Sequence, residues 1–193
     1  MVGYAVILLS FPQALAAWPA LGGAENLASD ALSGATYLSE FRYRDAMTVD
    51  EFLLNNPQVM HQQIIAGLFL LGGLGLIYLR IISWRIPLAL LITVGLLASV
   101  TYDQGSTQSM GSAWFHWATG GTMAAAFFVA TDPVTHPSRH SHQIIFAVSI
   151  GILLFVIRTQ GNLPDGIAFA VLLANCATPL LNRIHRQREK QHV

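Results

Sequence analysis

Residues 62–79, QQIIAGLFLLGGLGLIYL, decide the fold class of this chain. The run carries no charged side chain and approaches the length of about 20 residues that a helix needs to cross a bilayer. Its glycines, among them Gly67 and Gly73, are small residues that let neighbouring helices approach closely. The stretch therefore predicts a membrane-spanning helix in an all-α protein.

The composition agrees with a lipid environment. Of the 193 residues, 53% are hydrophobic and only 10% are charged, whereas soluble domains hold about 25% charged residues. The formal net charge is zero, so nothing indicates a nucleic-acid partner. The single cysteine, Cys176, excludes a disulfide framework within the chain, and we expect it to be a small packed residue.

Further apolar runs predict a polytopic membrane protein with about six transmembrane helices. We expect four regions: a first transmembrane helix over 1–19, one long polar loop over 20–61, a five-helix membrane domain over 62–182 and a basic tail over 183–193. The six predicted spans are 4–18, 62–79, 86–102, 112–130, 144–157 and 167–181.

Local signals mark several ends of these elements. Thr48 and Glu51 have the spacing of a capping box and predict a helix start. Asp132 and Pro133 predict the end of the fourth span, because proline cannot continue a helix. A tight loop is expected from Arg158 to Gly166.

The basic residues predict an orientation. With a cytoplasmic N-terminus and six spans, seven of the ten bases lie inside and three, Arg42, Arg44 and Arg158, lie outside. Because positive residues concentrate on the inner side, this orientation is favoured, and the loop 20–61 faces outward.

That loop holds the stretch Asp30-Ala31-Leu32-Ser33-Gly34-Ala35-Thr36. The Thr36 hydroxyl could carry a phosphoester, and the small residues Ser33, Gly34 and Ala35 would let a large group approach the backbone. The alternative is a turn before a helix, with Ser33 or Thr36 as the N-cap.

Three stretches together resemble a known family: residues 30–36 resemble its flavinylation motif, GGTMAAAFFVATDPVT at 120–135 its helix-and-loop signature, and LPDGIAFAVLLAN at 163–175 its C-terminal span. The family is RnfD, the D subunit of the Rnf electron-transport complex, which is related to the B subunit of the sodium-pumping NADH:quinone reductase. Residues 1–12 look like an internal span of that family, so the resemblance implies that its N-terminal half is missing from this chain.

The resemblance implies a translocase subunit that carries electrons, is not catalytic alone, and couples redox chemistry to ion transport in the bacterial inner membrane. It implies FMN esterified to Thr36 by a flavin transferase, and a second, non-covalent flavin such as riboflavin. Asp30 is either recognised by that transferase or a solvated loop acid. The implied partners are the other Rnf subunits, especially the G subunit, and membrane lipid. The flavin loop would lie on the periplasmic side.

Other interpretations stay open. The glycine-rich spans and the intramembrane Asn175 would also suit a non-redox channel or transporter, and a non-functional fragment of the family is a third interpretation. Tyr37, Phe41 and Tyr43 could pack on the flavin or anchor the loop at the membrane interface. Arg42 and Arg44 could balance the phosphate charge, although a solvated loop face is favoured.

Histidines offer less specific signals. His116 could bond a flavin or take part in proton transfer, but an interfacial position is the expected role. His136, His140 and His142 surround Pro137 at spacings that match no standard metal-ligand set.

Overall fold

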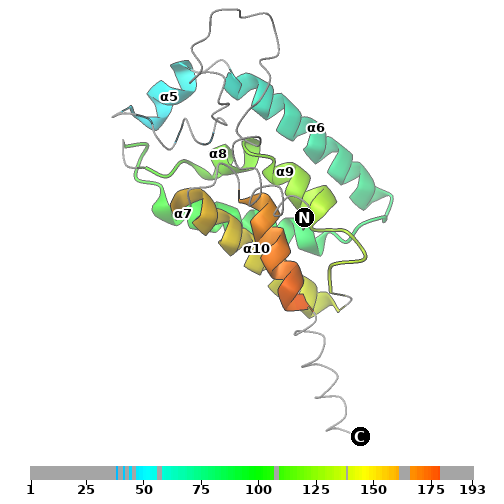
Figure 1. Ribbon diagram of the computed structural model, residues 1–193. Helices are drawn as coiled ribbons and strands as arrows, with labels where there is room; N and C mark the ends of the chain where they lie inside the picture. Colours follow the sequence, from blue (N-terminus) through cyan, green and yellow to red (C-terminus); the bar gives the residue numbers. More distant parts are fainter. Residues whose placement is uncertain are drawn as a thin grey trace, which may run out of the picture.

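The computed structural model describes residues 38, 41, 44, 47–55, 58–106, 109–137, 139–160 and 166–178. This part of the chain is helical and contains no strand, which confirms the all-α prediction for the described residues (Figure 1). The elements are α5 (Val49–Asn55), α6 (Gln58–Tyr78), α7 (Arg85–Thr101), α8 (Ala113–Ala118), α9 (Thr122–Ala124), the π-helix η1 (Ala125–Val129), α10 (His140–Gln160) and a further helix, Ile167–Thr178.

Four of the predicted spans, 62–79, 86–102, 144–157 and 167–181, correspond to α6, α7, α10 and Ile167–Thr178. The helical segments Val59–Tyr78 in α6 and His140–Gln160 in α10 are long and apolar enough to cross a membrane, while α7 and Ile167–Thr178 are shorter apolar helices. At 1.5 Å per residue, a 21-residue helix such as α10 is about 31 Å long, the thickness of a hydrocarbon core. The first predicted span, 4–18, lies outside the described residues, so the count of six stays a prediction.

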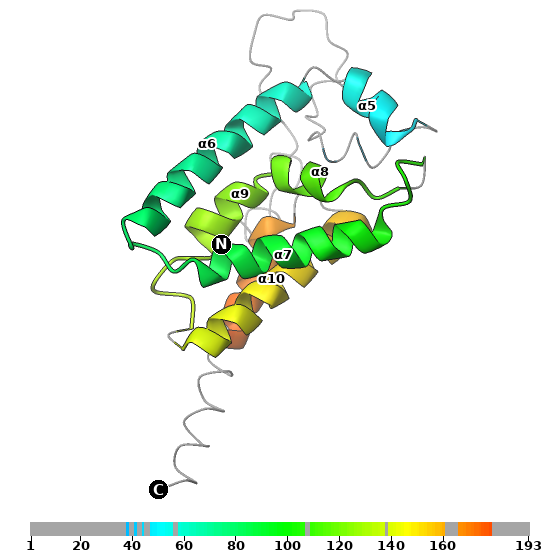
Figure 2. The ribbon, with the colours of Figure 1, turned by 180° about the vertical axis from the view of Figure 1, so that it is seen from behind.

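The helical bundle consists of α6, α7, η1, α10 and Ile167–Thr178. Helices α7 and α10 lie side by side, and α9 lies between them and α6 (Figure 2). The fully buried side chains of Leu90, Phe146, Ile150 and Leu154 form the centre of the core where α7 meets α10.

Helix α6 meets the rest of the bundle through glycine. A Cβ atom added at Gly73 would overlap the side chain of Phe127 in η1, and one at Gly72 would lie 3.4 Å from Phe128. The Phe128 ring also meets Phe69 edge to face, with centroids 5.6 Å apart. Small residues thus let α6 approach a neighbouring helix, as the glycine-rich sequence predicts.

The fourth predicted span, 112–130, is not one continuous helix. Helix α8 ends at Ala118, and Gly120 and Gly121 follow with φ of 63° and 71°. Two successive residues in this left-handed region interrupt the helix, and glycine adopts it without strain. The chain then resumes as α9, so the prediction of an unbroken span is wrong.

Local signals at helix ends were predicted correctly. Thr48 and Glu51 form the expected capping box: the Glu51 carboxylate accepts from the Thr48 N–H at 2.9 Å, and the Thr48 hydroxyl accepts from the Glu51 N–H at 3.3 Å. Asp132 forms the expected helix-stop turn, where its carboxylate accepts from the Val134 N–H at 3.4 Å and the Thr135 hydroxyl at 3.1 Å.

The prediction that Cys176 packs inside the protein is wrong, because its side chain is exposed. Ala170, Val171 and Ala174 turn one face of Ile167–Thr178 toward the core. At 3.6 residues per turn, Cys176 falls on the opposite face of that helix.

Candidate functional site

The five residues of the predicted site, Asp30, Ser33, Gly34, Ala35 and Thr36, lie outside the described residues. Three residues that follow them, Leu38, Phe41 and Arg44, are described and show where the chain goes next. Two groups of contacts result. One surrounds Phe41 and Arg44, and the other surrounds the break between α8 and α9.

Phe41 belongs to a small aromatic core. Its ring lies 5.3 Å from Phe52 of α5, edge to face, and 4.1 Å from Phe115 of α8. The side chain is 5% exposed. Phe41 therefore joins α5 to α8 and is not placed at an exposed membrane interface; Tyr37 and Tyr43 lie outside the described residues.

Arg44 connects the backbone around Phe41 to the loop that follows α7. Its guanidinium lies 4.0 Å from the centre of the Phe41 ring. It donates to the carbonyls of Phe41 at 3.0 Å and Met47 at 3.2 Å, and it also bonds the carbonyls of Ser106 and Ser109. The prediction of a solvated loop face is wrong for Arg44, whose five donors suit several carbonyl acceptors at once.

Arg158 performs a similar role at the break. This side chain is 8% exposed and extends from the last turn of α10, so the prediction that it opens an outer loop is wrong. It donates to the carbonyls of His116 at 3.1 Å, Gly120 at 2.9 Å and Thr119 at 3.5 Å. A helix C-terminus presents carbonyls without helical partners, and a cation there is favourable.

His116 lies in the interior beside these carbonyls. It is 2% exposed, and its ring lies between Phe115 and Phe155, with centroids 5.6 Å and 5.3 Å away. Its Nε2 lies 3.0 Å from the Met110 carbonyl, which can only accept, so Nε2 carries the proton. The other nitrogen, Nδ1, is then an acceptor, and it is buried without a hydrogen-bond partner. The interfacial placement expected from the sequence does not hold.

Leu38 brings the two groups of contacts together. A Cβ atom at Gly120 would overlap both a methyl carbon of Leu38 and the Arg158 guanidinium. Gly120 thus forms a notch into which Leu38 fits. Leu38, Phe41 and Arg44 all belong to the segment that follows Thr36, so that segment contacts both α8 and the break.

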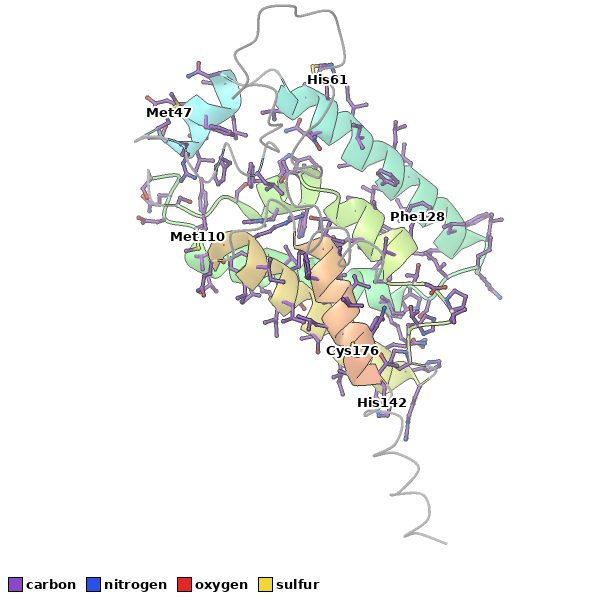
Figure 3. The ribbon with its side chains drawn as sticks, viewed as in Figure 1. Met47, His61, Met110, Phe128, His142 and Cys176 are labelled. Atoms are coloured by element: carbon purple, nitrogen blue, oxygen red, sulfur yellow. The ribbon has the colours of Figure 1, made fainter. Side chains whose placement is uncertain are left out.

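Figure 3 shows the two ends of the molecule. Met47 and Met110 lie at one end, near α5, while Cys176 and His142 lie at the other. Asn175, beside Cys176 in sequence, has a buried Oδ1 for which the described part of the chain offers no hydrogen-bond partner. No group of three His, Cys, Asp or Glu side chains that could hold a metal occurs in the described part of the chain.

Two helices long and apolar enough to cross a membrane indicate a helical membrane protein, in which the chain between α8 and α9 is broken beside the buried Arg158. The chain belongs to the NQR2, RnfD, RnfE family, whose model matches residues 1–191. This confirms the resemblance drawn from the three sequence stretches.

Curated relatives support the same family. The chain is 34% identical over 208 residues to the D subunit of the ion-translocating oxidoreductase complex of Ectopseudomonas mendocina, and 36% identical over 209 residues to that of Pseudomonas aeruginosa. Both alignments cover 100% of this chain, which spans 61% of the length of each relative. The D subunit of the same complex in Stutzerimonas stutzeri is 51% identical over 121 residues, 63% of this chain and 34% of that protein.

Proposed function

We propose that this chain is an electron-carrying subunit of an ion-translocating oxidoreductase complex and that it holds FMN covalently at Thr36. The observation that carries the proposal is the family match over residues 1–191, which includes the motif from Asp30 to Thr36. In the proposed site the Thr36 hydroxyl oxygen is esterified to the FMN phosphate. The small side chains of Ser33, Gly34 and Ala35 leave room for the flavin. Asp30 is recognised by the flavin transferase.

Flavin chemistry defines what the cofactor and the protein each contribute to electron transfer. The isoalloxazine ring accepts and donates electrons, while the protein supplies attachment, orientation and electrostatics. The chain alone would therefore not turn over a substrate. Its proposed partners are the other subunits of the complex, especially the G subunit as the second FMN carrier, and a second, non-covalent flavin such as riboflavin is part of the proposal.

We place the protein in the bacterial inner membrane with the flavin loop on the periplasmic side. The distribution of arginines supports this orientation. Arg44 and Arg158 bond carbonyls near α5 and α8, whereas Arg80 and Arg85 lie where α6 connects to α7 and Arg139 precedes α10. Successive helices alternate in direction, so these two sets fall at opposite ends, and the larger set belongs inside.

Covalent flavin is the direct test. The protein is co-expressed with a flavin transferase, denatured and separated on a gel, and flavin fluorescence is read at the mass of the chain. We expect a fluorescent band for the natural sequence and for Thr36→Ser, which keeps a hydroxyl, and none for Thr36→Ala. A band retained in Thr36→Ala would place the anchor elsewhere. No band in any sample, with the transferase active on a control substrate, would contradict the proposal.

A non-redox channel or transporter is the second candidate. The buried Asn175 Oδ1, which has no hydrogen-bond partner among the described residues, favours it, because polar groups inside membrane helices often mark transport paths. A channel has no use for covalent flavin, so the same gel separates the two candidates. Failure to co-purify with any partner subunit would instead support the interpretation of a non-functional fragment.

A further inference from the structure

Two contacts fasten the segment that follows Thr36 to the body of the protein. Leu38 fits the notch over Gly120, where any larger residue would displace it or Arg158. Arg44 bonds the carbonyls of Ser106 and Ser109, which lie more than 60 positions away in the sequence. These contacts come from different side chains, one apolar and one charged, and they reach different parts of the fold.

Leu38 lies two positions after Thr36 in the sequence. Leu38 sits against Gly120, at the break where Arg158 bonds the carbonyls of Thr119 and Gly120. The chain is therefore held at the α8–α9 break by Leu38, two positions after the proposed flavin anchor in the sequence.

Arg44 adds rigidity to this attachment. A guanidinium is a planar fork whose donors have fixed directions, so one that bonds several carbonyls holds them in one arrangement. Here it joins the backbone of Phe41 and Met47 to that of Ser106 and Ser109, with Phe41 beneath it. Phe41 is in turn held between Phe52 and Phe115.

We propose that Leu38 and Arg44 are positioning residues for the flavin, which hold its anchor beside the α8–α9 break instead of leaving it on a free tether. This inference rests on the proposed attachment of FMN to Thr36. An electron carrier held by a rigid surrounding shell keeps its ring in one place relative to the groups that exchange electrons with it. Neither residue touches the reacting atoms, and both act through the backbone that leads to Thr36.

The attachment can be measured without flavin. The chain has one cysteine, so Cys176→Ser gives a cysteine-free background, and Thr36→Cys in that background takes a nitroxide spin label at the anchor position. In lipid nanodiscs we expect the electron paramagnetic resonance spectrum of the full chain to show a mostly immobilised label. Leu38→Ala and Arg44→Met should each convert at least half of that component to a mobile one, and Arg44→Lys should restore part of it.

Two matched controls separate positioning from general disturbance. Leu54→Ala truncates a leucine of α5 that is 85% exposed, and Arg80→Met removes an exposed arginine from the turn after α6. Both should leave the label immobilised. Leu38 is only partly buried, so Leu38→Ala keeps the fold and decides the question even if Arg44→Met does not fold.

The outcomes distinguish this inference from the proposed function. A label that is mobile in the parent chain, or unaffected by both Leu38→Ala and Arg44→Met, overturns the positioning role even if Thr36 carries flavin. If both variants release an immobilised label but the natural sequence gains no flavin, the segment is attached as described. The attachment then does not serve to position a flavin. Flavin on Thr36 together with release by both variants supports the whole inference.

Discussion

The α5 end of the molecule, made of α5, the loop over 102–112 and α8, is held together differently from the helical bundle. At the α5 end, Arg44 and Arg158 each bond several backbone carbonyls. In the bundle, contacts between helices are mainly steric and apolar: Gly73 leaves space for the Phe127 side chain, and Leu90 and Ile150 lie in one buried apolar cluster. Both regions pack densely, but hydrogen bonds dominate the first and close approach of helices dominates the second.

The difference follows from the solvent around each region. Lipid tails are as apolar as leucine, so burial of apolar groups does little to hold spans together, and shape must do so. Only 6% of the apolar, membrane-length segment of α6 is buried in the protein, against 39% of that of α10. Loops and helix ends, in contrast, present carbonyls whose burial is costly unless each is bonded. Arginines near the end of the bundle meet that need.

Loss of Arg158 should produce the largest effect, because this residue of α10 reaches into the α8–α9 break. Arg158→Met removes one donor from each of the carbonyls of His116, Thr119 and Gly120 and keeps most of the apolar volume. The Thr122 hydroxyl still donates to the carbonyls of His116 and Thr119. Because a hydrogen bond to a charged group contributes about 1.5–3 kcal/mol, the loss of these bonds should cost about 3 kcal/mol. Reversible unfolding in mixed detergent micelles measures it.

Arg80→Met is the matched control for that experiment. Arg80 is exposed in the turn after α6, so its removal should change the free energy of unfolding by less than about 0.5 kcal/mol. Equal effects of the two substitutions would show that the α8–α9 break does not depend on Arg158. Hydrogen bonds from this arginine would then not be what holds the α5 end together.

Gly73→Ala tests the bundle itself. The added methyl group would overlap Phe127, including the region near its Cβ, so rotation of the ring alone cannot make room. Overpacking of this kind costs about 1–3 kcal/mol. Gly67→Ala, in the same helix but with nothing within 4 Å of the added atom, should change stability by no more than about 1 kcal/mol. The same unfolding assay compares them, and matching losses would mean that α6 is not held by shape.

The sequence predicted most of the helices correctly because their signals are local. The run 62–79 lies almost wholly within α6, which begins four residues earlier, and 86–102 is displaced by one residue from α7. Apolar periodicity and length are enough for such elements. The capping box at Thr48 and the stop at Asp132 likewise involve residues three or fewer positions apart.

What the sequence did not reveal depends on distant partners. Arg44 and Arg158 both appeared as loop residues, since a charge beside an apolar run usually marks its end. Their roles become visible only when the loop after α7 and the carbonyl end of α8 are placed beside them. The break at Gly120-Gly121 was not predicted, because apolar residues extend on both sides of it.

The smallest expected effect concerns pH at the α5 end. Hydrogen bonds from the backbone N–H and hydroxyl of Thr48 lower the pKa of the Glu51 carboxyl below its ordinary value near 4.5. A carboxyl whose pKa is lower in the folded chain stabilises that state above its unfolded pKa and loses this contribution as pH falls through the folded value. The start of α5 should therefore loosen in acid, while α10, whose described residues hold no carboxylate, should not.

Pepsin is active across that acidic range and provides the measurement. Cleavage within α5, relative to cleavage within α10, should rise about two-fold as pH falls through the Glu51 transition, the size expected for an exposed interaction. Glu51→Gln should abolish the pH dependence, and Asp50→Asn, a neighbouring exposed acid outside the capping box, should retain it. If Glu51→Gln kept the natural pH profile, a group other than Glu51 would cause the pH dependence of cleavage in α5. The capping box would then not stabilise the α5 end, and Arg44 would be its remaining polar attachment.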